Sequence, residues 1–505
     1  MNNQTKLILF AFCIIKLALH LIADSNSGFQ GDEFLHIETG NHLAFGFMEF
    51  PPFIGVLAFF QNLFQSESVF IHHLFPHISA ILILIFVSKI TIELGGKTKA
   101  VFLVLMCIII APAFGRSQQL FQPVVFSQLF WVVNFYLLTK YVKHLDKKYL
   151  WYLTITTALA FLSKYDAVFF MFGVSSLLFF KATRNSLLKH RFWLNVIAFL
   201  ALISPNIIWQ AVNDFPVLKM FTRLYETQLE RQETREVLQG FFMALNPLAL
   251  LITIPAIFSM FHYSMKFYRP LSLSILLSAM FLASSQGKGY YFYPIALTVL
   301  PFGGVFWERY ILSKRKWLIY PTGVILSVGV FLIPFGMPVF PLDSYLKYDY
   351  PYENRKVIEG GQFNVRFEER YSKDYWPVIL KELKNVHDSL PDEERNKTMI
   401  WGKHYAQAGA VNLFKERYDL PVAFSLHGSF YNWVPKGNMP ETTIGLGYNV
   451  GSFFKEYFDE VEKVRTFYNP YAETKEEQHQ HIYICKKPKQ TFDGLKTLFE
   501  KRIFE

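Results

Sequence analysis

The sequence predicts a polytopic α-helical membrane protein with a soluble α/β domain at its C-terminus. Three observations lead to this fold class. Of 505 residues, 52% are hydrophobic and 18% aromatic, which soluble domains rarely sustain over such a length. About eleven apolar runs are long enough to cross a membrane. The short loops on one side of these runs are basic, and polar residues dominate after about residue 340.

The apolar runs define the predicted spans. The first run is predicted to be a retained helix rather than a signal peptide, because Lys16 and His20 interrupt it and no small-residue cleavage site follows. A membrane domain over 1–337 is therefore expected to precede a polar domain over 338–505. The spans lie near 7–23, 69–92, 99–114, 124–142, 149–163, 167–180, 192–209, 240–262, 271–285, 290–307 and 317–337.

The loops between the runs predict the topology. With the N-terminus in the cytoplasm, every inner loop is basic, as the positive-inside rule requires. An odd number of spans then places residues 338–505 outside the cytoplasmic membrane. The net charge of +10 resides largely in these loops, which excludes a nucleic-acid groove as its explanation. The basic loops are 95–99, 143–148, 181–191, 265–269 and 308–316.

The polar third of the chain has an α/β pattern. Helical periodicity is followed by short β-branched or aromatic runs bounded by turn residues. The three cysteines are far apart in the sequence and imply neither a disulfide framework nor a zinc motif. Helices are predicted at 374–390, 404–417 and 491–502, and strands at 397–401, 421–425, 442–447, 461–467 and 480–486.

Acidic residues gather in the first outer segment, directly after the first span. Asp32 and Glu33 stand at the predicted membrane surface, with His36 three residues after Glu33. These three side chains could hold a divalent ion, although neither a metal nor another cofactor is required by the pattern. The alternative is an ordinary solvated loop, since exposed acids are common.

Lysines and aromatic residues occur at three further outer helix ends. Lys164, Tyr165 and Asp166 lie between two apolar runs, and a lysine at that depth is costly unless it snorkels or binds an anion. The other candidates are Lys288, Tyr290 and Tyr291 in GKGYYFYP and Trp209 and Gln210 in SPNIIWQ. Each site has a structural alternative. Lys164 could be a snorkelling lysine, GKGYYFYP an interfacial aromatic belt, and SPNIIWQ a helix end at Pro205 with a capping Asn206.

Together these groups suit a lipid-linked sugar phosphate. Cations would neutralise the phosphate, aromatic rings would stack on the sugar, and a carboxylate would remove a proton from an acceptor hydroxyl. A transporter or lipid-sugar flippase is the main rival, but its ionisable residues should lie near the bilayer midplane rather than at one face. A catalytically inactive family member is the second rival.

The same stretches resemble the bacterial branch of glycosyltransferase family 39, the membrane mannosyltransferase-like proteins of GT-C architecture. The matching motifs cover most of the chain and occur in the family's order. They are GDE (31–33), PPF (51–53), QPVVFSQLFW (122–131), FLSKYDA (161–167), SPNIIWQ (204–210), GKGYYFYP (287–294), YAQAGAVNLF (405–414), LPVAFS (420–425) and SFYNWVP (429–435).

This resemblance implies a GT-C fold, a polyprenyl-phosphate sugar donor and a bacterial cytoplasmic (inner) membrane. It implies that Asp32 or Glu33 is the catalytic acid of the first outer loop. The chain departs from the family at Ser127, where an acid is expected, so its specificity or activity could differ. The sugar and the acceptor, which could be a cell-envelope glycan, a lipid or a protein, stay open.

The polar domain has two interpretations. It could be a passive cap on the helices, or it could recognise the acceptor. A predicted loop offers an aromatic face together with hydrogen-bonding groups, a combination suited to a sugar ring. The candidate acceptor-binding residues are His427, Tyr431, Asn432 and Trp433.

Overall fold

The computed structural model describes residues 1–230, 234–285, 287–349, 365, 367–448, 451–472 and 478–504. The chain divides into two units. The first unit comprises Met1–Ala23, Phe50–Phe53 and His73–Val339, and the second comprises Asp24–Glu49, Ile54–His72 and Phe340–Glu505. The second unit thus joins the first outer segment to the polar C-terminal third.

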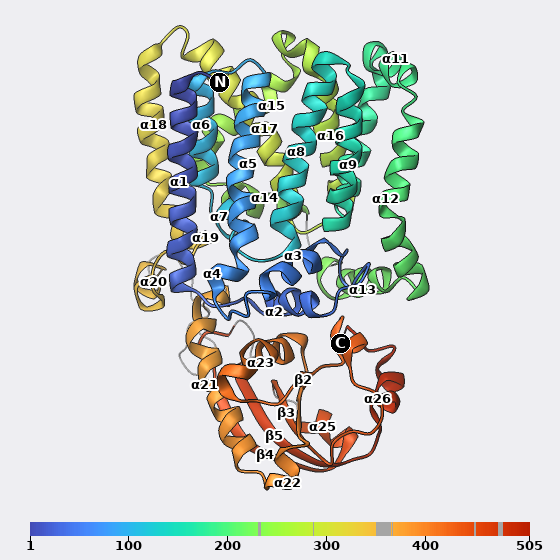
Figure 1. Cartoon of the computed structure of the whole chain (residues 1–505). Helices are drawn as coiled ribbons and strands as arrows, with labels where there is room; N and C mark the ends of the chain where they lie inside the picture. Colours follow the sequence, from blue (N-terminus) through green and yellow to red (C-terminus); the bar gives the residue numbers. More distant parts are fainter. Residues whose placement is uncertain are drawn as a thin grey trace. The chain divides into compact units, whose positions relative to one another are not determined.

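The first unit is a bundle of helices (Figure 1). A helix lies in each of the apolar runs predicted from the sequence. The longer helices of this unit are α1 (Asn3–Asn26), α5 (Leu74–Glu93), α6 (Thr98–Ile109), α8 (Pro123–His144), α9 (Lys147–Ser163), α12 (Trp193–Val212), α14 (Thr234–Ala244), α15 (Leu250–Phe261), α16 (Arg269–Ser284), α17 (Tyr293–Phe306) and α18 (Ile319–Val328). Shorter helices include α7 (Pro112–Arg116), α10 (Ala167–Val174), α11 (Lys181–Lys189), α13 (Pro216–Leu224) and α19 (Ile333–Gly336).

The apolar helices make the chain a multi-pass membrane protein. Within the described residues, 6 helical stretches are long and apolar enough to cross a membrane, or up to 8 if two bent pairs each form one span. Several other helices are shorter than a straight span needs. The number of spans, about eleven from the sequence, therefore stays a prediction.

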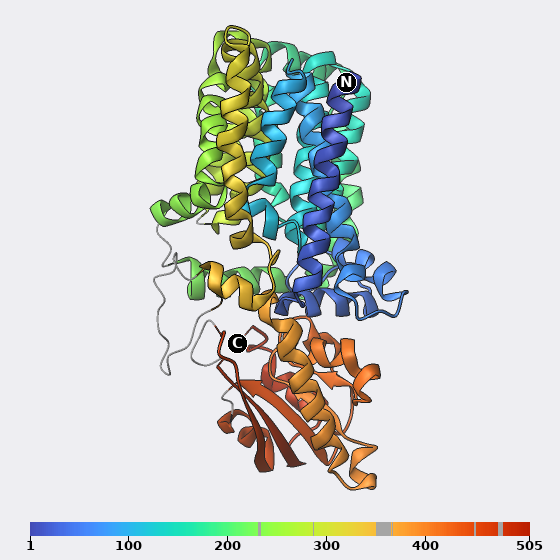
Figure 2. The ribbon, with the colours of Figure 1, turned by 90° about the vertical axis from the view of Figure 1, so that its left-hand side faces the viewer.

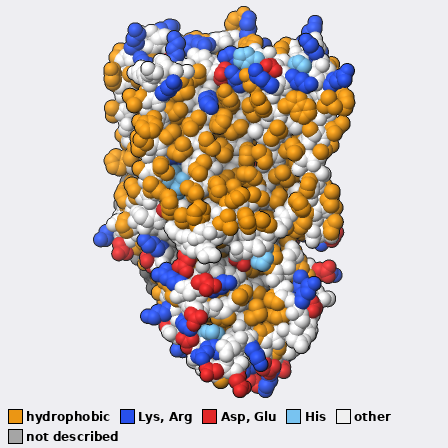
Figure 3. Space-filling view, viewed as in Figure 1, with side chains coloured by type: hydrophobic (Ala, Val, Ile, Leu, Met, Phe, Trp, Pro, Cys, Tyr) orange, Lys and Arg blue, Asp and Glu red, His pale blue; other side chains and the backbone are white. Residues whose placement is uncertain are grey.

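The surface of the helical unit supports the predicted sorting of charge. Figure 3 shows a broad hydrophobic band, with Lys and Arg side chains concentrated at one end. The basic helix α11 lies at the same end as the N-terminus (Figure 1). This is the pattern expected when basic loops share one side of a membrane. Which side of the membrane that end faces stays a prediction.

Small residues let the central helix α17 approach its neighbours closely. A Cβ on Gly303 would lie 2.3 Å from the carbonyl oxygen of Ile252, on α15. A Cβ on Gly304 would lie 2.7 Å from the carbonyl oxygen of Ala100, on α6. Close backbone packing of this kind is typical of membrane helices, where lipid provides no hydrophobic drive between helices.

The second unit contains a 5-stranded sheet in the order β2-β1-β3-β5-β4. The pairs β1–β2 and β1–β3 are parallel, whereas β3–β5 and β4–β5 are antiparallel. Trp401, on β1, is fully buried among the rings of Phe424, Phe454 and Tyr457. The strands are β1 (Met399–Gly402), β2 (Ala423–Phe424), β3 (Thr442–Tyr448), β4 (Phe458–Tyr468) and β5 (His479–Pro488).

Helices accompany this sheet, and α21 runs along it (Figure 2). They are α20 (Leu342–Asp349), α21 (Glu369–Asp388), α22 (Asp392–Arg395), α23 (Tyr405–Tyr418), α24 (Phe430–Trp433), α25 (Gly451–Tyr457) and α26 (Phe492–Phe499). The α/β class predicted for this part of the chain is therefore confirmed, and each predicted strand overlaps an observed one.

The first outer segment is helical rather than a simple loop. It forms α2 (Gly31–Glu38), α3 (Phe53–Asn62) and α4 (Val69–His72). Helix α2 packs on α23, and Gly409 permits this because a Cβ there would lie 2.8 Å from the Cβ of Phe34. The amide of Gly28 also donates to the carbonyl of Glu369 at 2.8 Å. The acidic segment is therefore held by the C-terminal part of the chain.

Candidate active site

The two acids of helix α2 have different surroundings: Glu33 caps the N-terminus of the helix, whereas Asp32 is accessible. The side chain of Gln30 accepts from the amide of Asp32 at 3.0 Å, and the carboxylate of Glu33 accepts from the amide of Gln30 at 2.8 Å. This capping box occupies Glu33, which is fully buried. Asp32 is half-buried and is the one residue of α2 that is not buried. Of the two predicted acids, Asp32 is therefore the accessible one.

Tyr405, the first residue of α23, holds the carboxylate of Asp32. Its hydroxyl donates to Oδ1 of Asp32 at 2.6 Å. Burial, with the neighbouring Asp32 charge, raises the pKa of Tyr405 well above its usual value of 10.0, so the phenol remains a donor. Sequence reasoning did not assign Tyr405 a role, although the YAQAGAVNLF motif begins with it.

Two histidines stack beside Tyr405. The ring centroids of His404 and His427 lie 4.3 Å apart, and that of Tyr405 lies 4.0 Å from His404 and 4.9 Å from His427. Burial lowers the pKa of His404 to about 4, against the opposing effect of Asp32. Burial and the charges of His404 and Lys403 lower the pKa of His427 well below its usual value. Both imidazoles are therefore neutral at pH 7 and offer hydrogen bonds without a positive charge.

A second carboxylate, that of Glu49, lies in the same unit. It accepts hydrogen bonds from the amide of Ser429, at 2.8 Å, and from the Ser429 hydroxyl. Gly428 makes this approach feasible, because its φ is +57° and a Cβ there would lie 2.0 Å from Oε1 of Glu49. Burial raises the pKa of Glu49 to about 7, and the charge of Asp32 adds to the rise. Sequence reasoning missed Glu49, which just precedes the PPF motif.

The raised pKa of Glu49 predicts a pH-dependent stability. The unfolded carboxyl ionises near 4.5 and the folded one near 7, so the folded state binds more protons between these values. The free energy of unfolding should fall as pH rises through this window. Glu49→Gln should flatten the pH dependence by on the order of 1 kcal/mol, since Glu49 is partly exposed.

This is measured as the unfolding temperature of the purified protein from pH 5 to pH 8. Glu416→Gln, an exposed change on α23, is the matched control. An unchanged pH profile in Glu49→Gln would show that Glu49 titrates normally.

The candidate acceptor residues differ in their surroundings. Trp433 stacks on His42 with ring centroids 4.4 Å apart, and Asn432 is exposed. The hydroxyl of Tyr431 instead donates to the carbonyl of Lys496 at 2.9 Å, a structural bond. His427 is half-buried beside Tyr405, as described above. His36 is buried within α2.

A second polar group lies in the first unit, around Lys164. Lys164 follows α9, and its Nζ lies 2.7 Å from Oδ2 of Asp166. The hydroxyl of Ser127, on α8, donates to both oxygens of Asp166, at 2.9 and 3.0 Å. An acid in place of Ser127 would put two carboxylates side by side, which is unfavourable, whereas the hydroxyl of Ser127 donates to Asp166. Asp166 supplies a carboxylate beside the position where the family is expected to have one.

Aromatic rings cover the Lys164 ammonium. Nζ lies 3.9 Å from the ring centroid of Tyr291 and 5.6 Å from that of Tyr290, which is a cation–π arrangement. Lys288 directly precedes the short helix that carries these tyrosines, and within the described residues its ammonium forms no ion pair. The structure therefore brings Lys164, Tyr290 and Tyr291 together. The carbonyl of Lys288 accepts from the amide of Tyr291 at 3.0 Å, but within the described residues the Lys288 ammonium makes neither an ion pair nor a cation–π contact with this group.

Tyr165 extends the group toward α12. Its hydroxyl donates to Oδ1 of Asn206 at 3.0 Å and accepts from Nε2 of Gln210 at 3.2 Å. Trp209, on the same helix, is half-buried. The predicted residues of SKYD, GKGYYFYP and SPNIIWQ thus form two hydrogen-bonded or ring-contacting sets, one around Lys164 and one around Tyr165, its neighbour in the chain.

The fold is that of known membrane glycosyltransferases. ArnT from Cupriavidus metallidurans, in the apo state, matches with a TM-score of 0.58 and 11% identity over 94% of this chain and 97% of that chain. The oligosaccharyltransferase AglB from Archaeoglobus fulgidus matches with a TM-score of 0.52 and 13% identity over 83% of this chain. Residues 51–209 match the family model described as dolichyl-phosphate-mannose-protein mannosyltransferase. The chain has the GT-C fold.

The GT-C resemblance predicted from the motifs is thereby confirmed. The match to AglB spans 64% of the length of that protein, so it does not extend to all of its parts. No curated protein matches the chain in sequence.

Proposed function

We propose that this GT-C protein is a glycosyltransferase that moves a sugar from a polyprenyl-phosphate donor to an acceptor hydroxyl. The observation that carries the proposal is the carboxylate of Asp32, half-exposed on a capped helix and held at 2.6 Å by the hydroxyl of Tyr405. The donor class is supported by the solved neighbours: ArnT is described as bound to undecaprenyl phosphate, and AglB as bound to a dolichol-phosphate.

In the proposed reaction the acceptor oxygen forms a bond to the anomeric carbon of the donor sugar. The bond between that carbon and the phosphate oxygen breaks, and the phosphate leaves with the electron pair. Asp32 takes the proton of the acceptor hydroxyl as general base. Lys164 stabilises the charge that develops on the phosphate, so no general acid is required. Glu33 supports Asp32 by capping α2.

We propose that residues of the second unit bind the acceptor. Exposed Asn432 and half-buried Trp433 combine a hydrogen-bonding group with an aromatic face, which suits a sugar ring. The hydroxyl of Tyr431 is already engaged, so Tyr431 contributes mainly through its ring. We further propose that residues 338–505 form a domain outside a bacterial cytoplasmic membrane. A reporter fused to the C-terminus would test this, and a cytoplasmic signal would contradict it.

The activity is tested with purified protein, labelled polyprenyl-phosphate sugars and a cell-envelope extract. Transfer of the label to an extract component supports the proposal. Movement of the labelled lipid between leaflets of a vesicle without transfer would instead indicate a flippase. Donor binding with neither transfer nor flipping, across the sugars tested, would indicate an inactive member of the family.

Tyr405→Phe should reduce the transfer rate about tenfold, the scale of one hydrogen bond of ~1–1.5 kcal/mol. Because Tyr405 acts through Asp32, the donor KM should change little. The same substitution should have no further effect in an Asp32→Asn background. Tyr418→Phe, on the same helix, is the matched control. Additive losses in the double variant would contradict a role through Asp32.

A further inference from the structure

A buried polar group lies where α1 ends and α5 begins. Lys16, His20 and Asp24 recur every four residues along α1 and therefore share one face of the helix. His73 immediately precedes α5, and His77 is in its first turn, so these two also share a face. Asp24, His20, His73 and His77 are all buried. Buried ionisable groups of this kind are rare in an apolar bundle and commonly mark a functional or ion-binding position.

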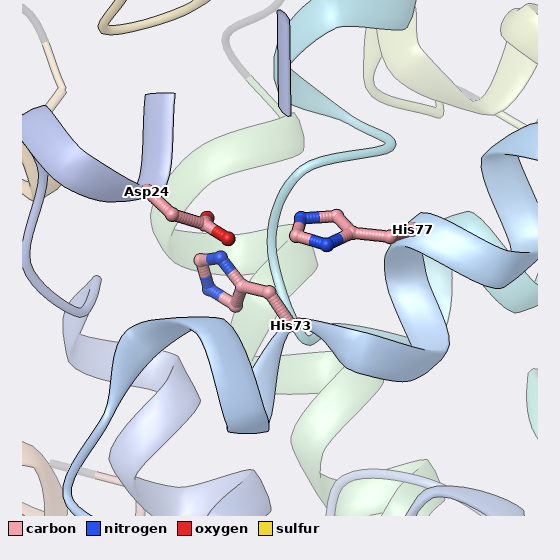
Figure 4. A group of neighbouring side chains, drawn as sticks. All are labelled: Asp24, His73 and His77. Carbon is pink, nitrogen blue, oxygen red and sulfur yellow. The ribbon is translucent and has the colours of Figure 1, made fainter. Parts of the chain in front are cut away.

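The side chains of Asp24, His73 and His77 lie close together. The carboxylate of Asp24 points toward the rings of His73 and His77 (Figure 4). One ligand atom from each of the three residues lies within 4.8 Å of the other two. The ring of His77 is 5.1 Å from that of His20 and 5.9 Å from that of His73, measured between centroids. Because Asp24 and His20 are on the same helix, their spacing is fixed by α1.

Gln119 determines which nitrogen of His20 carries the proton. Its Oε1 lies against Nδ1 of His20, and its Nε2 donates to the carbonyl of His20 at 3.3 Å. An amide oxygen only accepts, so Nδ1 of His20 is the donor and Nε2 retains its lone pair. That Nε2 is buried and has no hydrogen-bond partner among the described residues. Nε2 of His20 can therefore coordinate a metal ion together with the two other histidines and the carboxylate. The hydrogen bond from Nδ1 to Gln119 fixes the orientation of the ring for this role.

We infer that Asp24, His73 and His77 bind a divalent transition-metal ion of the Zn²⁺ class, with His20 as the fourth ligand. Imidazole nitrogens with one carboxylate suit zinc, whereas Mg²⁺ and Ca²⁺ prefer oxygen ligands. Bonds of ~2.0–2.1 Å in a tetrahedral site require small side-chain rotations to bring the ligand atoms together. The ion ties the end of α1 to the start of α5 and stabilises the bundle.

This site is separate from Asp32, and the inference does not rest on the proposed glycosyl transfer. It also differs from the metal site predicted from sequence. Within the described residues, Asp32, Glu33 and His36 do not bring their ligand atoms together, whereas Asp24, His73 and His77 do. The sequence signal is two pairs at a spacing of four residues, His20 with Asp24 and His73 with His77, which is the spacing that places ligands on one face of a helix.

The first test uses the wild-type protein and Co²⁺ as a spectroscopic substitute for Zn²⁺. Full-length protein is stripped with a chelator and titrated with Co²⁺. The expected result is the intense visible absorption of a tetrahedral ion, saturating at about one equivalent and abolished by Zn²⁺. Absence of a saturable visible band in folded, stripped protein would overturn the inference.

The second test uses His73→Gln/His77→Gln. This variant should bind Co²⁺ at least about a hundredfold more weakly, since loss of an outer-shell partner alone costs about 10–100-fold. Its unfolding temperature should match that of stripped wild type and should no longer rise with Zn²⁺. His262→Gln, at an exposed position outside the group, should behave as wild type. Unaltered Co²⁺ absorption in the double variant would assign the ion to other residues and overturn the site.

Discussion

Asp32→Asn is expected to reduce sugar transfer by about a hundredfold or more, the usual scale for loss of a general base. The asparagine oxygen can still accept from the hydroxyl of Tyr405, so α2 should keep its position on α23. The amide cannot take the proton of the acceptor hydroxyl. The loss should therefore appear in the transfer step, measured in a single turnover with saturating donor, while donor affinity and unfolding temperature stay near wild type.

Glu33→Gln is the matched control for this prediction. It removes the same charge one residue away, and glutamine can replace glutamate in a capping box. If Glu33 serves only to cap α2, this variant should retain transfer. Wild-type turnover in Asp32→Asn, or a deeper loss in Glu33→Gln, would contradict the assignment of Asp32 as the base.

Lys164→Met is expected to weaken binding of the lipid-phosphate donor by about 10–100-fold, which corresponds to a charge-assisted hydrogen bond of ~1.5–3 kcal/mol. The substitution also leaves the carboxylate of Asp166 without its cation. Some loss of stability is therefore expected as well, because an unpaired, largely buried charge is unfavourable. The double variant Lys164→Met/Asp166→Asn should recover stability without recovering donor affinity. Binding is measured by titration with an undecaprenyl-phosphate sugar.

The chain offers a close control in Lys140→Met. Lys140 is on α8 and pairs with Glu93 at 3.0 Å, and its side chain is 18% exposed against 16% for Lys164. This variant should keep donor affinity. Lys288→Met should have a smaller effect than Lys164→Met, because Lys288 is joined to Tyr291 through its backbone carbonyl and its ammonium makes no cation–π contact with the described tyrosines around Lys164. Unchanged donor affinity in Lys164→Met would leave Lys164 as an interfacial cation paired with Asp166.

The sequence by itself determined the features that depend on near neighbours along the chain. Hydropathy predicted the helices of the first unit, and the spacing of Lys and Arg predicted that one end would be basic, as Figure 3 shows. Alternation and turn residues predicted the strands after residue 395. Hydropathy and periodicity suffice here because burial in lipid or in a sheet acts on every residue of an element. Hydropathy likewise placed Asp32 and Glu33 just after the first span, but it could not show which of the two is accessible and which caps the helix.

Only the tertiary structure decided which of these side chains meet. Tyr405 reaches Asp32 across 373 positions in the sequence, and Ser127 reaches Asp166 across 39. Glu33 became a helix cap, and His73 and His77 met Asp24, whereas the predicted grouping of Asp32, Glu33 and His36 did not form. Successive residues of a helix point in different directions around its axis, so Asp32, Glu33 and His36 can face different surroundings although they are close in the sequence. Pairing between distant residues depends on how the elements pack, which local patterns do not encode.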